Sequence, residues 1–313
     1  MVRLVAAGAL VACFGLSAAA SAAESKKAPT TTSTVSAEPN FIIGSLLVQR
    51  IGDRGTPVIL VPGLASGAWV WQGTVKRLKD AHVVYVVTLA GFDGRPAVSG
   101  DLMKQALLSL KGLILTQKLV RPVLIGHSLG GVLSLALAQN EPGLVSGVIS
   151  IDGLPVFPGT DAMSAAQRPA MVESIKSGMT GLNHEQFASQ QQQYMRSVGV
   201  IDPKVADQLA KLSSKSDPAA TAEYMAETLM IDLRPNLGKI AVPVLLVSPY
   251  NAPDGARLKM SEAGKTAYYR SLMAGAPKVE VVSISPARHF AMFDQPTLVG
   301  EAIAGFLAKA EAR

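Results

Sequence analysis

The sequence contains short apolar runs, rich in Val, Ile and Leu, that alternate with segments of helical spacing. The clearest runs are 57–61, 123–125, 145–151 and 242–247. A continuous apolar run is typical of a strand buried on both faces, as in parallel sheets covered by helices. Parallel strands need crossover connections, which the helical segments would supply. The pattern predicts an α/β fold with a mostly parallel central sheet.

Other segments extend the same alternation. We expect further strands at 46–51, 82–89 and 279–284, and helices at 68–79, 101–118, 129–139 and 296–310. Asp101 is a favourable N-cap residue, and Pro296 stands near the start of the last helix, where proline is tolerated. Helices between successive strands are expected on both faces of the sheet.

One long segment, 154–238, interrupts the alternation because it contains no convincing strand. Asp202-Pro203 and Asp217-Pro218 are typical N-cap and N1 pairs, and apolar residues such as Met179 and Met225 recur along the segment. The segment predicts a helical cap inserted into a core made of 40–153 and 239–313. Most of its methionines are expected to pack the cap helices together, and some could line a pocket.

The first residues have the composition of a secretory signal peptide. Arg3 precedes an apolar run over 4–16, and Ala20-Ser21-Ala22 is a small-residue cleavage site. We expect a signal peptide over 1–23 and a disordered linker, rich in Ser, Thr, Ala, Lys and Pro, over 24–39. These features predict an exported protein, periplasmic or secreted, without stable membrane insertion after cleavage.

Cys13 is the only cysteine, and it lies in this leader. The Leu10-Val11-Ala12-Cys13 sequence resembles a lipobox, so lipid attachment at Cys13 is an alternative to cleavage after Ala22 or Ala23. After cleavage, the mature chain would contain no cysteine, which excludes disulfides and a thiolate nucleophile.

The charge and size of the chain limit its partners. The net charge of +6 is spread along the 313 residues, without the concentrated basic face that nucleic-acid binding requires. Hydrophobic residues make up 49% of the chain, which is enough for a sizeable core. We therefore expect a small-molecule substrate and no nucleic-acid partner.

The sequence Gly126-His127-Ser128-Leu129-Gly130 follows an apolar strand and precedes a helix. In this context a G-x-S-x-G pattern predicts a sharp turn that exposes the serine at the carboxyl edge of the sheet. The flanking glycines allow strand and helix to pack closely. Ser128 is therefore the candidate nucleophile.

A serine hydroxyl needs a base that removes its proton. His289 follows the last strand and precedes the final helix, which is the position that such a base requires. His82, His127 and His184 do not occupy this position. His289 is therefore the candidate base.

A carboxylate should orient the base, and two aspartates are candidates. Asp254 follows the strand at 242–247 at a distance of a few residues, and the chain order Ser, Asp, His favours it. Asp152 ends the strand at 145–151 beside the same edge, but it also precedes Gly153 as a turn residue. We prefer Asp254 and keep Asp152 as the alternative.

An oxyanion would need main-chain N–H donors near the nucleophile. Leu129 directly follows Ser128, and Leu64 lies in the Gly-containing loop after the strand at 57–61. These two residues are the candidate oxyanion hole. The chemistry requires neither a cofactor nor a metal.

Together, Val61-Pro62-Gly63-Leu64-Ala65, Gly126–Gly130 and Arg288-His289-Phe290 resemble the α/β-hydrolase fold, over about residues 45–310. The similarity is to the esterase, lipase and perhydrolase branch with a serine nucleophile. It is not to the dehalogenase or epoxide hydrolase branches, which place Asp at that position. The family usually has His-Gly in the oxyanion loop. This chain has Pro62-Gly63, so one N–H is missing there.

The resulting hypothesis is an exported serine hydrolase that cleaves a carboxylic ester, or a related acyl compound, through an acyl-enzyme. Two alternatives remain open at this point. The chain could be a non-catalytic binding protein on the same scaffold, or an acyltransferase or perhydrolase that uses the same residues.

Overall fold

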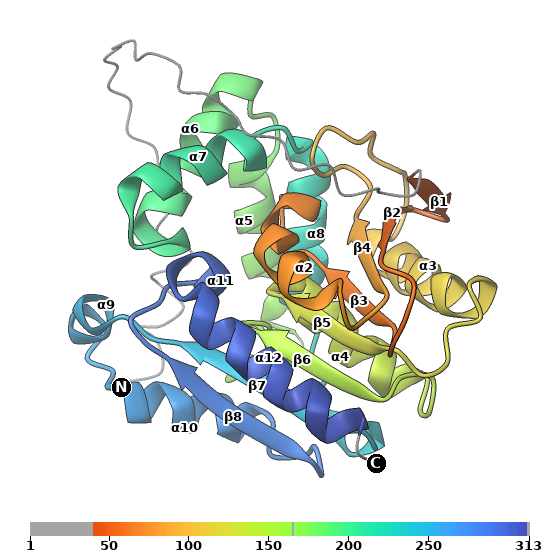
Figure 1. Cartoon of the computed structure of the whole chain (residues 1–313). Helices are drawn as coiled ribbons and strands as arrows, with labels where there is room; N and C mark the ends of the chain where they lie inside the picture. The colour runs from red at the N-terminus through yellow and green to blue at the C-terminus, as the bar shows by residue number, and fades with distance from the viewer. Residues whose placement is uncertain (1–39, 165, 312–313) are drawn as a thin grey trace.

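The computed structural model describes residues 40–164 and 166–311, shown in Figure 1. Its centre is an eight-stranded sheet in the order β1-β2-β4-β3-β5-β6-β7-β8. The strands are β1 (Phe41–Ile43), β2 (Leu46–Ile51), β3 (Val58–Val61), β4 (Val84–Thr88), β5 (Val123–His127), β6 (Gly147–Ile151), β7 (Val244–Pro249) and β8 (Val279–Ile284). Pairing is antiparallel for β1 with β2 and for β2 with β4, and parallel elsewhere. The predicted fold class is confirmed.

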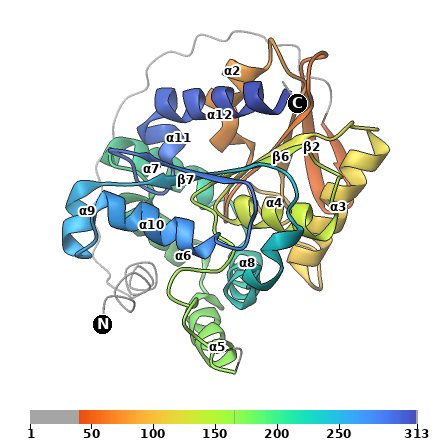
Figure 2. The ribbon, with the colours of Figure 1, turned by 90° about the horizontal axis from the view of Figure 1, so that it is seen from below.

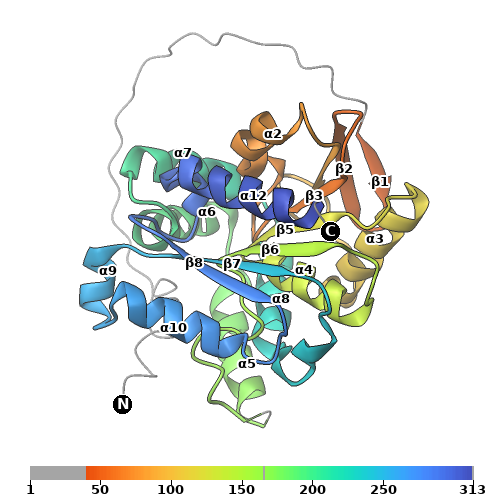
Figure 3. The same ribbon diagram turned by 60° about the horizontal axis from the view of Figure 1, so that its bottom comes forward.

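Helices cover both faces of the sheet (Figures 2 and 3). The helices outside the β6–β7 connection are η2 (Ala68–Trp71), α2 (Gln72–Leu78), α3 (Leu102–Thr116), α4 (Leu129–Asn140), α9 (Ala252–Arg257), α10 (Glu262–Leu272), α11 (Ala291–Asp294) and α12 (Pro296–Glu311). Helices α3, α4 and α10 pack in one apolar cluster, and α2 and α12 in another. The central strands are therefore buried between two helical layers.

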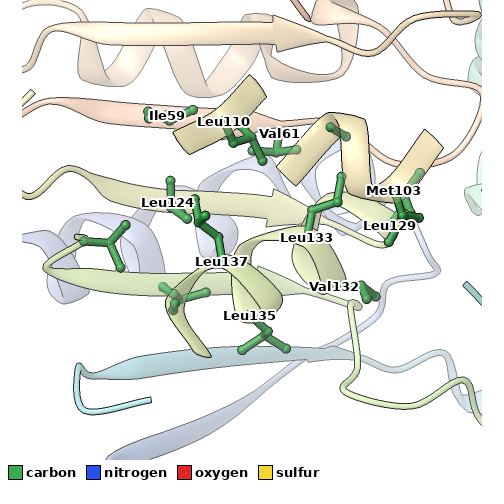
Figure 4. Packing of buried hydrophobic residues seen from close by; sticks show 14 of the residues in the cluster. Ile59, Val61, Met103, Leu110, Leu124, Leu129, Val132, Leu133, Leu135 and Leu137 are labelled. Carbon is green, nitrogen blue, oxygen red and sulfur yellow. The ribbon is translucent and has the colours of Figure 1, made fainter. Parts of the chain in front are cut away.

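Successive side chains of β3 point to opposite faces of the sheet, so this strand contributes to both apolar clusters. Ile59 and Val61 pack in the cluster with α3 and α4, whereas Val58 and Leu60 pack in the cluster with α2 and α12. Figure 4 shows the first cluster, in which Leu133 and Leu137 of α4 lie over the strands. All four β3 residues are fully buried, which explains why this strand has a continuous apolar run.

The connection between β6 and β7 contains several helices, and it is called the cap below. These are α5 (Arg168–Met179), α6 (His184–Tyr194), the π-helical turn η3 (Met195–Gly199), α7 (Pro203–Ser213), α8 (Pro218–Met230) and the 3₁₀ turn η4 (Arg234–Lys239). The Asp202 and Asp217 side chains accept hydrogen bonds from the N–H groups of Lys204 and Ala220, as N-caps do. Helix α5 packs on α8, and α6 packs on α7.

A cap carboxylate joins α8 to the core. Both oxygens of Glu227 accept main-chain hydrogen bonds at the start of α3, from Leu102 N at 2.8 Å and Met103 N at 2.6 Å. A negative charge is favourable at this helix end, where the N–H groups have no intrahelical partner. The contact fixes α8 relative to the sheet.

The expected signal peptide, Cys13 and the linker at 24–39 lie outside the described residues. Within 40–164 and 166–311, no helix is both long and apolar enough to cross a bilayer.

Asp232, which follows α8, pairs with two arginines, and one of them, Arg168 of α5, is buried. Arg168 Nη2 lies 2.8 Å from Asp232 Oδ2, and Arg234 Nη2 lies 2.7 Å from the same oxygen. Hydrogen bonds from Arg234, and then from Arg168, lower the pKa of Asp232 to about 2 against the effect of burial. The carboxylate therefore stabilises the fold above about pH 4, and this contribution is lost as the pH falls through about 2.

We predict that Asp232→Asn lowers the free energy of unfolding at neutral pH by about 3 kcal/mol, because the buried Arg168 loses its counter-charge. Urea titrations from pH 7 down to pH 2 measure the difference from wild type. It should shrink toward the acid end, where the wild-type carboxyl is itself protonated. Asp207→Asn removes an exposed pair with Arg196 and should cost far less. A difference that is constant over the whole pH range would contradict the assignment.

Candidate active site

Ser128 lies on the turn between β5 and α4, and its backbone is strained. Its φ of 52° and ψ of −118° place its backbone in a region that residues other than glycine rarely adopt. A Cβ on Gly126 would lie 2.1 Å from Gly130 O, and one on Gly130 would lie 2.1 Å from Val61 O. Only glycine fits at these two positions, which is the reason for the G-x-S-x-G spacing.

The loop after β3 packs against this turn. A Cβ on Gly63 would lie 3.1 Å from Ser128 Cβ, so the loop and the serine are in close contact. Leu64 and Leu129 both line the cavity that contains Ser128. Among the described residues, no acceptor takes the main-chain N–H of Leu64 or of Leu129. The two predicted oxyanion residues thus lie beside Ser128, with their N–H groups unoccupied.

The loop after β8 carries His289, which pairs with Asp152. The His289 Nδ1 and Asp152 Oδ2 atoms are 2.6 Å apart, and both side chains are almost buried. An ionised carboxylate only accepts hydrogen bonds, so the proton lies on Nδ1 and the histidine donates. This tautomer leaves Nε2 as the ring nitrogen that can accept a proton.

The preference for Asp254 as the partner of His289 is wrong. Asp254 lies in the short helix α9, where it accepts hydrogen bonds from Asn251, Arg257 and Arg288. Asp152 directly follows β6, and its N–H donates to Val247 O of β7 at 3.0 Å. Its φ of 51° turns the chain at the sheet edge, which brings the carboxylate to His289. The alternative acid of the sequence analysis is the one in contact.

Two residues of α10 stabilise the ionised form of Asp152, and neither was indicated by the sequence. The Tyr269 hydroxyl donates to Asp152 Oδ1 at 2.5 Å, and Lys265 Nζ lies 5.2 Å from the centre of the Tyr269 ring. Burial by itself would raise the pKa of Asp152, but the Lys265 charge and the hydrogen bonds from His289 and Tyr269 hold it below its ordinary value. The carboxylate therefore stays ionised beside His289.

His127 is buried beneath His289. Its Nε2–H donates to the His289 main-chain oxygen at 3.0 Å, and its ring centre is 4.6 Å from that of His289 and 4.5 Å from that of Phe290. Burial, with the neighbouring His289, lowers the pKa of His127 to about 3. His127 is therefore neutral at physiological pH and cannot compete with His289 for a proton.

Ser128, His289 and Asp152 line one cavity of about 1080 Å³, including the part open to solvent. The wall from the β6–β7 connection is largely apolar. It consists of Leu154, Val156, Phe157, Pro158, Met179, Gln191, Tyr194, Thr221, Met225, Thr228 and Ile231. No lysine or arginine is among the described residues that line the cavity. No group of three or more His, Cys, Asp or Glu side chains in 40–164 and 166–311 is placed to hold a metal ion.

A sequence profile of the alpha/beta hydrolase family matches residues 58–302, which include the serine turn, Asp152 and His289. The chain belongs to this family. The resemblance drawn from the three motifs is therefore confirmed.

Several curated relatives are esterases. The pimeloyl-[acyl-carrier protein] methyl ester esterase of Pectobacterium carotovorum subsp. carotovorum (strain PC1) is 26% identical over 219 residues, which cover 68% of this chain and 82% of the relative. The esterase of the same name from Aliivibrio salmonicida (strain LFI1238) is 27% identical over 218 residues, covering 67% and 78%.

Solved structures share the fold. The enol-lactonase from Burkholderia xenovorans LB400 has a TM-score of 0.65 at 20% identity, over 86% of this chain and 100% of that chain. A thermophilic esterase from Thermogutta terrifontis has a TM-score of 0.67 at 23% identity, over 87% and 99%. At these identities the likeness establishes the common fold alone.

We predict that the glycines of the turn around Ser128 are required for the stability of the fold. Gly126→Ala or Gly130→Ala should lower the free energy of unfolding by about 3 kcal/mol or more, because the added Cβ meets main-chain atoms that cannot rotate away. Gly305→Ala is the matched control, since Gly305 is exposed in α12 with no atom within 4 Å of its Cβ position. It should raise stability by up to about 1 kcal/mol. Chemical unfolding of the three variants measures the effect, and equal stabilities would refute it.

Proposed function

We propose that this protein is an exported serine hydrolase that cleaves carboxylic esters through an acyl-enzyme on Ser128. The observation that carries the proposal is the convergence of Ser128 and the His289–Asp152 pair on one largely apolar cavity. The esterase relatives support the reaction class. Export rests on the leader at 1–23.

In the proposed reaction, Ser128 Oγ attacks the ester carbonyl while His289 Nε2 takes its proton. The N–H groups of Leu64 and Leu129 bind the oxyanion that forms on the carbonyl oxygen. His289 then protonates the alcohol that leaves. Water, deprotonated by the same histidine, releases the acid from Ser128. Asp152 holds the His289 tautomer and stabilises the imidazolium without taking the proton itself.

The cavity wall favours an uncharged acyl chain. Met179 of α5, Met225 of α8 and Phe157 provide apolar surface, and methionine adapts its shape to a bound group. Because no cationic side chain lines this cavity within the described residues, a carboxylate in the acyl chain would be buried without a partner. We propose neutral, mainly aliphatic acyl groups as the substrate class.

We predict that Ser128→Ala abolishes hydrolysis of short activated esters and labelling by a fluorophosphonate probe. Asp152→Asn should lower kcat by about a thousandfold or more, because asparagine cannot hold the required histidine tautomer. Asp254→Asn should lower kcat far less, by about tenfold, since Asp254 does not contact His289 and reaches its loop only through Arg288.

The discriminating measurement is steady-state kinetics of the three purified variants beside wild type. Equal rates for wild type and Ser128→Ala would overturn the proposed function and favour a binding protein. A larger loss in Asp254→Asn than in Asp152→Asn would reverse the assignment of the acid. Product analysis with an added alcohol or peroxide separates hydrolysis from acyl transfer, because both reactions share the acyl-enzyme.

We also predict a strong discrimination against charge in the acyl chain. The kcat/KM for a neutral ester should exceed that for an isosteric ester with a terminal carboxylate by about a hundredfold or more, from the cost of burying an unpaired charge. Met225→Lys, which would place a cation in the cavity wall, should narrow this ratio. An unchanged preference in that variant, or a carboxylate ester that reacts as fast as the neutral one, would contradict the proposal.

A further inference from the structure

The loop that carries His289 is hydrogen-bonded to the cap. His289 N–H donates to Val198 O at 3.2 Å, and Phe290 N–H donates to Gly199 O at 2.9 Å. Both acceptors belong to η3, the π-helical turn that follows α6. The backbone of the base is thus attached to the β6–β7 connection as well as to the sheet.

The side chain of Arg288 reinforces this attachment. Its Nη1 donates to Arg196 O at 2.9 Å and to Val200 O at 3.1 Å. The last carbonyl groups of a helix have no intrahelical partner and carry partial negative charge, which a guanidinium at that end satisfies. Arg288 therefore binds the C-terminal end of the α6–η3 helix.

Asp254 fixes the orientation of the guanidinium. Its Oδ2 accepts from Arg288 Nε at 2.7 Å, and its Oδ1 accepts from Arg288 Nη2 at 3.3 Å. Both side chains are mostly buried, with 20% and 23% of their surface exposed. The planar guanidinium thus faces a carboxylate of the core on one edge and carbonyl groups of the cap on another, which a lysine could not reproduce.

A second carboxylate completes the junction. Asp294 Oδ2 accepts from Arg288 N–H at 2.8 Å, and Asp294 Oδ1 accepts from Ile201 N–H at 2.9 Å. The segment 288–294 is therefore hydrogen-bonded to the cap segment 196–201 by two side chains, those of Arg288 and Asp294. The main-chain N–H groups of His289 and Phe290 add two further bonds.

We propose that Arg288 is a positioning residue that holds His289 against the cap, with Asp254 as the anchor of its guanidinium. The inference rests on the proposed function, in which His289 is the base. Asp152 holds the imidazole ring, and Arg288 holds the backbone that carries it. A misplacement of the base by about 1 Å costs about a hundredfold in rate, so a loosened loop reduces turnover even when Asp152 is intact.

The test compares Arg288→Met, Arg288→Lys and Asp254→Asn with wild type. Arg288→Met should lower kcat about a hundredfold with little change in KM, because substrate contacts are unaltered. Arg288→Lys should recover part of this loss, since the ammonium retains the charge but not the paired hydrogen bonds. Asp254→Asn should lose about tenfold. It also serves as the second variant if Arg288→Met does not fold.

A structural measurement keeps the inference separate from the proposed function. Hydrogen–deuterium exchange should accelerate over 288–294 in Arg288→Met. The substitution removes the side-chain hydrogen bonds to Arg196 O and Val200 O, so the main-chain bonds from His289 and Phe290 to Val198 O and Gly199 O should open more often. Lys176→Met is the matched control, since it removes a cap ion pair with Glu223, between α5 and α8, and neither residue lines the cavity that contains His289. It should leave both kcat and this exchange pattern unchanged.

Folded Arg288→Met with wild-type kcat and wild-type exchange would overturn the inference. An equal loss of kcat in Lys176→Met would also overturn it, because general loosening of the cap would then be sufficient. If Ser128→Ala were as active as wild type, the proposed function would fail. The exchange of 288–294 would still report whether Arg288 holds this loop.

Discussion

The close approach of α4 to the central strands is the constraint on which the rest of the structure depends. A Cβ on Gly131 would lie 2.1 Å from Ser150 Oγ, and one on Gly153 would lie 2.5 Å from Ser128 O. With Gly126 and Gly130, these glycines let β3, β5, β6 and α4 meet at one edge of the sheet. Ser128 and Asp152 follow adjacent strands at this edge, so the packing itself brings the proposed nucleophile and the proposed acid together.

Much of the fold and part of the candidate site could be predicted because the signals are local. The buried strands show as apolar runs, and the glycine spacing around Ser128 follows from the contacts of the turn. His289 could be selected because only one histidine follows the last strand. Each of these inferences needs only the order of elements along the chain and the steric properties of the residues themselves.

The acid could not be chosen from the sequence, because its identity depends on which strand end faces the histidine loop. Asp254 is near the end of β7, but Arg288 occupies its carboxylate, and nothing in the spacing of these two residues reveals that pairing. Asp152 before Gly153 has the sequence of an ordinary turn. Tyr269 and Lys265 lie within a helix whose pattern gives no sign that Tyr269 bonds to Asp152 or that Lys265 lies over the Tyr269 ring.

The position of Asp152 also has a consequence for protein engineering. The proposed acid lies two residues before Leu154, where the β6–β7 connection begins to line the cavity. The main chain at the proposed base, His289, is bound to carbonyl groups of η3. A chimera that takes its cap from a relative must therefore join the chains after Gly153, so that the acid is kept. Its donor must also present carbonyl groups where residues 196–200 do. Under the proposed function, exchanging the cap would therefore also exchange groups that hold the proposed base, and not only the wall of the cavity.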